Sequence, residues 1–229
     1  MSLTPYYEHG GIVIYHGDCR EILPYVACDA IVTDPPYKLS QEYSASVDAD
    51  NLVAVASVGW VAPLLLQSIR IGGMAAVFYD TRILPLALEA FRKSGWKYLR
   101  HLTLYRRWGV ASKTHGWMST SDFVLLFQRP GAKEAYYGDT NHDVFVKGSP
   151  EPESYGHPSQ KPLVFVRQLV ANLTPPHGVV CDPWAGSGTS LVAAQHLSRR
   201  AIGIEIEERY CEIAAKRLQQ EVLPLEMGA

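Results

Sequence analysis

An alternation of short apolar segments with longer segments of helical periodicity constrains the fold of this chain more than any other feature. It is clearest toward the C-terminus, where strands are expected at residues 179–181 and 201–204 and helices at 187–197 and 207–221. Consecutive parallel strands need a crossover connection, which is usually a helix, so this order favours parallel pairing. We therefore predict an α/β fold with a mostly parallel central sheet and helices on both faces.

The same alternation extends over the rest of the 229 residues. Further strands are expected at residues 11–15, 29–33, 74–79, 98–105 and 121–128, and further helices at 19–25, 52–69, 84–93 and 163–173. Residues 131–155 are rich in Gly, Pro, Asp and Asn without clear periodicity, which indicates an irregular insertion. The length suits one α/β domain with a full core, so a single domain over residues 1–229 is expected.

Cysteine usage and charge limit the function classes. The four cysteines, Cys19, Cys28, Cys181 and Cys211, form no C-x-x-C pair, so buried thiols are expected rather than a metal or redox site. No basic segment followed by an apolar run begins the sequence, which favours a cytoplasmic protein without a membrane partner. The net charge is −2, so DNA binding would require a local basic face, for which residues 92–113 are the candidate.

A glycine-containing loop follows the expected strand at residues 179–181. It reads DPWAGSGT over residues 182–189, and Glu205 ends the next expected strand. This layout is typical of nucleotide-binding βαβ units, where glycines admit a ligand and a later carboxylate binds ribose hydroxyls. However, Leu191 replaces the third glycine of the dinucleotide motif, and Asp182 would repel a pyrophosphate. Both departures favour a ligand with adenosine and a positive charge, such as S-adenosylmethionine; the alternative is a turn without a ligand.

A second segment, Asp34-Pro35-Pro36-Tyr37, directly follows the expected strand at residues 29–33. Two prolines prevent further ladder pairing and an immediate helix, so a rigid loop is expected at the carboxyl end of the strand. The amino nitrogen of a nucleobase is a poor nucleophile because its lone pair is delocalised. The Asp34 carboxylate and the Pro35 carbonyl could accept its two N–H bonds, and the Tyr37 ring could stack on the base. The alternative is a Pro-Pro turn capped by an aspartate.

In this order the two segments resemble the amino-group DNA methyltransferases, in the permuted (beta) arrangement with the catalytic motif ahead of the cofactor motif. Three further segments match: Gly17-Asp18-Cys19, residues 157–162 with the sequence HPSQKP, and residues 203–218. The resemblance implies a circularly permuted, Rossmann-like S-adenosylmethionine methyltransferase fold. Residues 179–221 would supply its first two βα units, and residues 12–37 the next strand, helix and catalytic strand.

The resemblance also implies a reaction and the residues that perform it. S-adenosylmethionine would donate a methyl group directly to the amino nitrogen of a base flipped out of double-stranded DNA, without a metal. The catalytic residues would be Asp34, Pro35, Pro36 and Tyr37. The cofactor-binding residues would be Asp18, Cys19, Asp34, Ser159, Lys161, Asp182, Pro183, Trp184, Gly186, Ser187, Gly188, Thr189 and Glu205. DNA would contact Lys38, Arg106, Arg107 and Lys113, with a short target-recognition insertion around residues 106–155.

Asp34 favours adenine N6 as the target, because aspartate at this position is associated with adenine in the resembled family and serine with cytosine. Cytosine N4 is the nearest alternative, since both bases carry an amino group beside a ring nitrogen. Methylation of RNA or of a protein amide is a second alternative, although those families usually have asparagine at this position. A non-catalytic regulator that binds S-adenosylmethionine is a third, and the presence of Asp34 and Tyr37 argues against it.

The expected macromolecular partners are double-stranded DNA and a second copy of the chain. A short recognition region contacts few base pairs, and a two-fold dimer duplicates those contacts. The candidate dimer interface lies in the apolar residues of 52–66 or 83–91, and the alternative is that these residues only cover the sheet. The sequence leaves a cognate restriction endonuclease open as a further partner.

Overall fold

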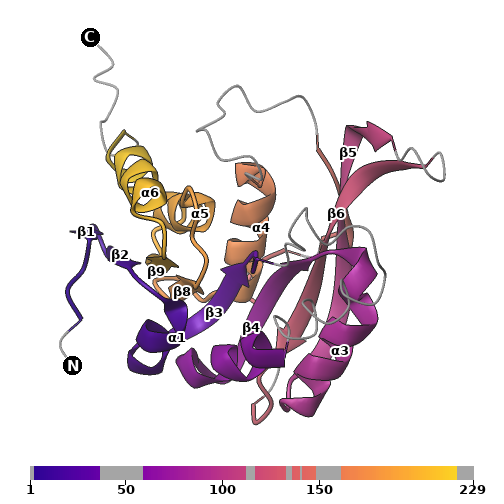
Figure 1. The fold of residues 1–229 in the computed structure, drawn as a ribbon, viewed down its shortest axis with the longest axis horizontal. Coiled ribbons are helices and arrows are strands. Elements are labelled where there is room, and N and C mark those ends of the chain that lie inside the picture. The colour runs from indigo at the N-terminus through magenta and orange to yellow at the C-terminus, as the bar shows by residue number, and fades with distance from the viewer. Residues whose placement is uncertain are drawn as a thin grey trace.

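The computed structural model describes residues 3–36, 59–111, 117–132, 136–139, 141–147 and 161–220 (Figure 1). Within them nine strands form one sheet in the order β1-β2-β9-β8-β3-β4-β6-β5-β7. The strands are β1 Tyr7–His9, β2 Ile12–His16, β3 Cys28–Thr33, β4 Ile69–Tyr79, β5 Lys97–Ala111, β6 Met118–Gln128, β7 Val144–Val146, β8 Val179–Asp182 and β9 Arg200–Glu205. The helices are α1 Cys19–Ile22, α3 Leu84–Lys93, α4 Leu163–Leu173, α5 Thr189–His196 and α6 Glu208–Gln220, with a further helical segment at 59–68.

Five neighbouring strands, β2, β9, β8, β3 and β4, run parallel at the centre of the sheet. β6 is antiparallel to both β4 and β5, β7 is parallel to β5, and β1 is antiparallel to β2. From β8 the chain crosses to β9 on one side, whereas from β3 it crosses to β4 on the other. The direction of the connections therefore reverses between β8 and β3, and ligands of open α/β sheets bind at the carboxyl ends of such strands.

The strand order confirms the permuted arrangement. The strand before the glycine loop, β8, comes late in the chain, and the strand before Asp34, β3, comes early. The two strands are nevertheless neighbours, since Ala30 pairs with Val180 and Ile31 with Cys181. β8 and β9 thus provide the first part of the sheet in the unpermuted order, and β2 and β3 continue it, as the resemblance implies.

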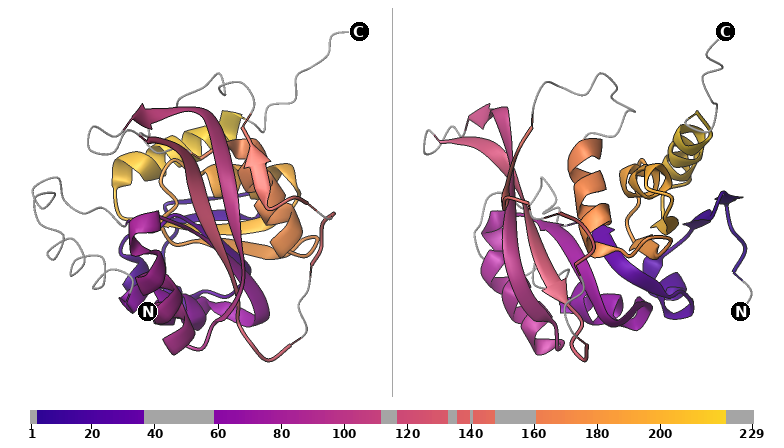
Figure 2. Two further views of the ribbon diagram at one scale, coloured as in Figure 1. Left: turned by 90° about the vertical axis from the view of Figure 1, so that its right-hand side faces the viewer. Right: turned by 180° about the vertical axis from the view of Figure 1, so that it is seen from behind.

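Helices pack on both faces of the sheet, as the sequence predicts (Figure 2). Along β4, Met74 and Phe78 belong to the core beneath α4, α5 and α6. Ala75 and Val77 belong to the opposite core, beneath α1, α3 and residues 59–68. The alternation follows from the two-residue period of a strand, and each large apolar side chain buried in this way contributes about 1.5–3 kcal/mol.

The bounds of α3 and α4 agree with the predicted helices at residues 84–93 and 163–173. The helix predicted over residues 52–69 is wrong at its end, because Ile69 already belongs to β4. Residues 52–58 lie outside the described part of the chain. The three-residue edge strand β1 was absent from the prediction, since so short a segment carries little periodicity.

Strand β4 is longer than the strand predicted at residues 74–79, because Gly72-Gly73 lies inside it rather than before it. The pairing register against β3 shifts at this point. Gly72 has a φ of +82°, and a Cβ on Gly73 would lie 2.6 Å from the carbonyl oxygen of Asp29. The two glycines therefore accommodate an irregularity within a strand, where the sequence indicates a turn.

Strands β5 and β6 are also longer than the predicted strands at residues 98–105 and 121–128. The last pair between β4 and β6 joins Tyr79 to Phe123, whereas β5 and β6 stay paired as far as Ala111 and Met118. The β5–β6 hairpin therefore extends past the carboxyl edge of the sheet, where β3 and β8 also end (Figure 1). The stretch predicted as an irregular insertion contains the short strand β7.

None of the described helices has the length and apolar character needed to cross a membrane. All four cysteines are buried and none forms a disulfide, as predicted. Apolar residues predicted as a dimer interface are largely buried within this chain: Val61, Leu65, Ala87 and Phe91 are at most 2% exposed and pack under the sheet. These four side chains therefore serve the core of one subunit.

Candidate active site

The loop between β8 and α5 lies at the carboxyl edge of the sheet. Gly186 and Gly188 have φ values of +52° and +79°, a region that glycine adopts most readily. A Cβ on Gly188 would lie 2.8 Å from the Cβ of Ala214, so this glycine also lets α6 pack against the loop. Leu191, at the place of the missing third glycine, packs on Gly203, where a Cβ would lie 2.7 Å from its Cδ1 atom. The close helix–strand contact is thus kept by a glycine on the strand.

Glu205, at the end of β9, holds the loop from one side. Its carboxylate is 9% exposed and accepts hydrogen bonds from the backbone N–H of Gly186 at 2.8 Å and of Glu207 at 2.9 Å. Its carbonyl accepts a bond from Gly17 N–H at 2.9 Å, which ties the start of α1 to the same place. Each carboxylate oxygen accepts one of these bonds and retains a lone pair, so ribose hydroxyls could also donate to it.

Asp182, at the end of β8, holds the loop from the other side. Its carboxylate is 6% exposed and accepts hydrogen bonds from the hydroxyls of Thr33, at 2.7 Å, and Ser190, and from Trp184 N–H at 3.2 Å. Burial raises the pKa of Asp182 to about 6, against the lowering effect of these bonds, and the charge of Asp34 raises it further. Two acidic side chains therefore share this edge, which suits a cationic ligand.

Asp34 directly follows β3 and lies at the same carboxyl edge of the sheet. Its half-buried carboxylate accepts a hydrogen bond from Lys161 Nζ at 2.6 Å. Pro35 is buried and Pro36 is exposed, and Tyr37 lies outside the described residues. The sequence assigns Lys161 to the cofactor, whereas the structure places its ammonium on Asp34.

Asp18 caps α1 beside Gly17. It accepts hydrogen bonds from Arg20 N–H at 2.9 Å and from the Arg20 guanidinium. The side-chain bond from Arg20 is the main reason that the pKa of Asp18 lies below its usual value. Cys19 is 5% exposed, and burial raises the pKa of its thiol to about 12. Asp18 is thus an anion and Cys19 a neutral thiol at neutral pH.

Trp184 and Arg217 support the loop from its outer sides. The Trp184 ring packs on Trp60, with ring centroids 5.7 Å apart, so it contacts the helical segment 59–68. Arg217 is 3% exposed in α6 and donates to the Ser187 carbonyl at 2.6 Å and to the Thr189 hydroxyl at 3.2 Å. A helical arginine predicts a surface charge, so the role of Arg217 was not found from the sequence.

The structure brings most of the predicted site residues to one edge of the sheet. They stand at or just after the ends of β2, β3, β8 and β9, with Lys161 before α4: Asp18, Cys19, Asp34, Pro35, Pro36, Lys161, Asp182, Pro183, Trp184, Gly186, Ser187, Gly188, Thr189 and Glu205. Tyr37, Lys38, Lys113 and Ser159 lie outside the described residues. The contacts of Thr33, Ser190 and Phe78 with this group were not predicted, because they depend on packing between distant segments.

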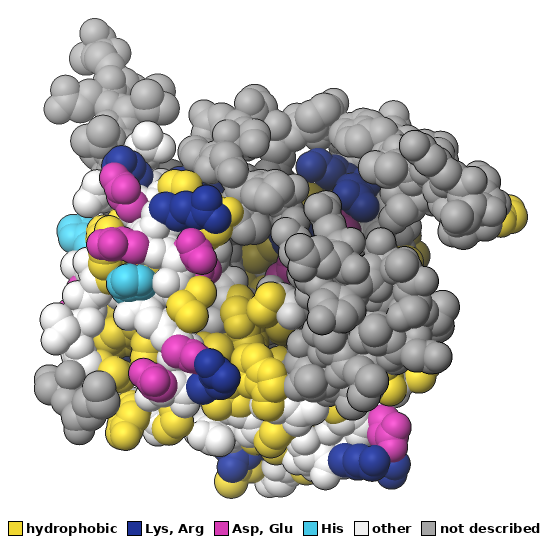
Figure 3. Space-filling view, in the orientation of Figure 1, with side chains coloured by type: hydrophobic (Ala, Val, Ile, Leu, Met, Phe, Trp, Pro, Cys, Tyr) yellow, Lys and Arg dark blue, Asp and Glu magenta, His cyan; other side chains and the backbone are white. Residues whose placement is uncertain are grey.

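Two of the predicted DNA contacts, Arg106 and Arg107, lie on the hairpin. Arg106 is in β5, where it pairs with Asp122 of β6 at 3.4 Å, and Arg107 follows it in the same strand. Positive and negative side chains are interspersed on the face shown in Figure 3. In the described part of residues 92–113, three cations pair with acidic side chains of other segments, so part of the basic charge is compensated: Lys93 with Glu89, Arg100 with Asp143 and Arg106 with Asp122.

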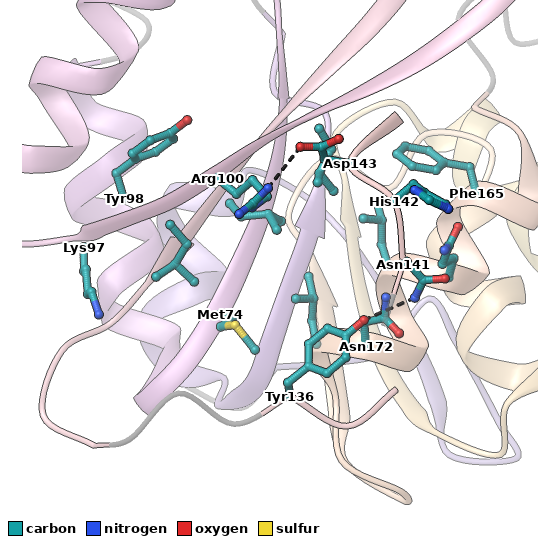
Figure 4. A pocket seen from close by; sticks show the side chains of 16 residues that line it. Met74, Lys97, Tyr98, Arg100, Tyr136, Asn141, His142, Asp143, Phe165 and Asn172 are labelled. Atoms are coloured by element: carbon teal, nitrogen blue, oxygen red, sulfur yellow. Dashed lines mark hydrogen bonds and ion pairs between the residues drawn. The ribbon is translucent and has the colours of Figure 1, made fainter. Parts of the chain in front are cut away.

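A separate cavity of about 680 Å³ lies between the first half of β5, the residues 136 and 141–143 that precede β7, and α4 (Figure 4). Its floor is apolar and includes Met74 and Phe165. Its rim side chains bond to one another, as Asn141 does to the Tyr136 hydroxyl at 3.2 Å. None of the predicted site residues lines this cavity. Its lining residues Met74 and Lys97 lie toward the edge of the sheet opposite the glycine loop.

The sequence model of the N6/N4 DNA methylase family matches residues 28–216, which span both the Asp34 loop and the glycine loop. The chain belongs to this family. The methyltransferase therefore acts on DNA, and S-adenosylmethionine is its methyl donor. Its acidic, glycine-lined edge fits that cofactor, which carries an ammonium and a sulfonium but no phosphate.

Known relatives agree over nearly the whole chain. The methyltransferase is 26% identical to the type II methyltransferase M2.DpnII of Streptococcus pneumoniae, with 96% of this chain and 94% of the relative covered. The solved M1.HpyAVI–SAM complex is 25% identical with a TM-score of 0.73, covering 90% and 98% of the two chains. The cytosine-N4-specific PvuII DNA methyltransferase has a TM-score of 0.81 at 17% identity, covering 99% and 92%, which shows a shared fold.

Proposed function

We propose that this methyltransferase transfers the methyl group to the N6 amino group of adenine at specific DNA sites. The observation that carries the proposal is the position of Asp34 at the reversal point of the sheet. The residue before it, Thr33, donates its hydroxyl to Asp182 at 2.7 Å, so the proposed base acceptor and the cofactor loop occupy adjoining strand ends. Base and cofactor would then meet across two neighbouring strands.

Bound S-adenosylmethionine supplies an electrophilic methyl group on its sulfonium. The Asp34 carboxylate and the Pro35 carbonyl accept the two N–H bonds of the target amino group and draw its lone pair out of conjugation. The carboxylate also stabilises the positive charge that develops on the nitrogen as its lone pair bonds to the methyl carbon and the carbon–sulfur bond breaks. S-adenosylhomocysteine would be the leaving group, and the methylated nitrogen would then lose one proton to solvent. The two prolines restrict the loop backbone, which fixes the angle of both acceptors. The Tyr37 ring stacks on the flipped base.

The cofactor is held, in this proposal, by residues of the braced loop. Glu205 binds the ribose hydroxyls with the lone pairs that its two backbone bonds leave unused. Asp18 faces the adenosine, and Asp182 with the backbone of residues 183–189 lies along the methionine part. The buried carboxylates attract the positive charges of this ligand.

We propose the β5–β6 hairpin as the DNA-contacting element, within one methyltransferase domain whose recognition insertion spans residues 106–155. The hairpin extends past the edge that holds Asp34, and a two-stranded ribbon fits the major groove (Figure 1). Arg106 and Arg107 lie on it, and Trp117 beside its tip is 78% exposed. Lys38 and Lys113 would contribute from outside the described residues.

Adenine is preferred over cytosine because Asp34 stands at the first motif position. A direct test is to incubate the purified enzyme with unmethylated DNA and labelled S-adenosylmethionine, digest the DNA and identify the nucleosides by mass spectrometry. We expect N6-methyladenine. N4-methylcytosine alone would contradict the target assignment and leave the family unchanged, and an absence of DNA methylation would contradict the proposed function.

We also propose that the enzyme works as a homodimer, through surfaces other than the core side chains of residues 59–68 and α3. Two copies would duplicate the few base contacts that one hairpin provides. Light scattering should give about twice the 25.4 kDa of one chain. A mass near 25.4 kDa, both with and without DNA, would exclude the dimer.

A further inference from the structure

Lys161 lies beside the proposed catalytic carboxylate, just before the buried Pro162 and α4. Its ammonium donates to Asp34 Oδ2 at 2.6 Å, and its side chain is 17% exposed. Ammonium groups are strongly hydrated, so a lysine this far from solvent needs partners in fixed positions. Asp34 is one such partner.

Phe78 of β4 is the second partner. The Lys161 ammonium lies 4.9 Å from the centroid of the Phe78 ring. Phe78 is 3% exposed and packs edge-on against Phe165 of α4, with centroids 6.1 Å apart. Because both rings belong to the core, Phe78 has little freedom to turn away. The ammonium is therefore held between a fixed aromatic face and the Asp34 carboxylate.

We propose that Lys161 is a positioning residue for Asp34, an inference that rests on the methyl transfer proposed above. By occupying Oδ2, Lys161 leaves Oδ1 to accept the N–H of the target amino group. The ion pair also restricts rotation of the carboxylate about its Cβ–Cγ bond. Asp34 is then oriented before the base arrives, which places Lys161 on the base side of the site rather than on the cofactor carboxylate.

The first test separates the rate of methyl transfer from cofactor affinity. At saturating S-adenosylmethionine, Lys161→Met should lower the single-turnover rate by roughly 10- to 100-fold, the scale for a misplaced reacting group. The dissociation constant for S-adenosylmethionine should change little, and Lys161→Arg should recover part of the rate. An unchanged rate with weakened cofactor affinity would assign Lys161 to the cofactor and overturn the inference.

A matched control is Lys216→Met, since Lys216 pairs with Glu212 on the surface of α6 and its side chain is 66% exposed. This variant should keep the wild-type rate. A loss equal to that of Lys161→Met would mean that removing any lysine slows the enzyme, through weaker attraction to DNA, and would overturn the positioning role.

A second test does not depend on methyl transfer. Thermal unfolding of Asp34→Asn, Lys161→Met and the double variant forms a double-mutant cycle. We expect the double variant to lose less in Tm than the sum of the single variants, because either change alone breaks the same contact. Additive losses would show that the pair does not form in solution and would overturn only the positioning role. An inactive wild type would instead overturn the proposed function together with it.

Discussion

Charged side chains are used differently on the cofactor side of the sheet, β8 to α6, and on the hairpin side, β5 to β7. On the cofactor side the charged side chains next to the glycine loop are buried and bonded to backbone, as Glu205 is to Gly186 N–H at 2.8 Å and Arg217 to the Ser187 carbonyl at 2.6 Å. On the hairpin side the described ion pairs are exposed or partly exposed and join charged side chains to one another. The Arg100 and Asp143 side chains, 64% and 51% exposed, form a pair at 3.0 Å.

This difference indicates how much change each region tolerates. Breaking a buried hydrogen bond to a charged group costs about 1.5–3 kcal/mol, whereas an exposed ion pair contributes about 0–1 kcal/mol. The cofactor loop therefore has one permitted geometry, which suits a ligand that does not vary. The hairpin can change its surface residues at little cost to the fold, and in the proposed function such changes would alter the DNA sequence that it contacts. Five measurements test this contrast.

Asp34→Ala should have the largest effect. The carboxylate is the proposed acceptor for the target amino group, so methyl transfer should fall by about 10²- to 10³-fold or more. Cofactor affinity should survive, because Glu205 and the glycine loop remain intact. The measurement is a radiolabel transfer assay beside calorimetry with S-adenosylmethionine. Full activity in this variant would refute the mechanism. A loss of cofactor binding would assign Asp34 to the cofactor rather than to the target base.

Glu205→Ala should come next. The variant loses the buried carboxylate that holds the loop and, in the proposal, the ribose. S-adenosylmethionine binding should therefore weaken by about 1–3 kcal/mol. Glu207→Ala is the matched control, because this neighbouring acid is exposed and its backbone N–H keeps its bond to Glu205. Equal calorimetric affinities for the two variants would contradict the assignment of Glu205.

Cofactor affinity should also depend on pH through Asp182, whose pKa is raised to about 6 by burial. A cationic ligand favours the carboxylate, so affinity should be full above about pH 6 and fall by up to tenfold for each pH unit below it. Asp182→Asn should remove this dependence. The range from pH 5 to 7 lies around this raised pKa. A wild-type affinity that stays constant over that range would contradict a contact between Asp182 and the cofactor.

The same pKa sets the sign of a stability effect in the unbound protein. Because the folded value of about 6 lies above the ordinary value of 3.8, protonated Asp182 favours the folded chain. Its contribution to the free energy of unfolding is complete below about pH 4 and is lost as the pH rises through about 6. Asp182→Asn should flatten this part of the stability curve in urea titrations.

Arg106→Gln on the hairpin should have the smallest effect. Arg106 already pairs with Asp122 at 3.4 Å, so part of its charge is balanced before DNA binds. DNA affinity should fall only a few-fold, with a salt dependence shallower by about one unit and no change in cofactor affinity. Arg92→Gln, in the last turn of α3, is the control. A change in cofactor affinity for Arg106→Gln would show that the two regions are coupled and contradict the contrast.

Local patterns were enough to predict much of the fold. The periodicity of residues 84–93 and 163–173 gave the bounds of α3 and α4, and the alternation of elements gave the parallel sheet. The long β5–β6 hairpin was not predicted in full, because its outer part pairs only with itself and has no continuous apolar face. The beginning of β4 at Ile69 was not predicted, because the Gly72-Gly73 pair indicates a turn.

Some residues of the candidate site could likewise be predicted from local patterns, and others could not. Asp34 and Glu205 could be found because each stands in a short motif at a strand end. The pairing of Lys161 with Asp34 could not, since the two residues are 127 positions apart. The burial of Arg217 under the loop likewise depends on how α6 packs, which periodicity alone does not determine.

The neighbouring position of β3 and β8 has a consequence for how the enzyme is made. Thr33 and Asp182 touch although 149 positions separate them, so the early strand leaves the ribosome long before its partner exists. Contacts between such distant segments form slowly, because a long loop must close first. Until then β3 lacks one of its two neighbouring strands and keeps an open edge. A chain that ends before β8 therefore lacks both the strand that pairs with β3 and the glycine loop that follows it.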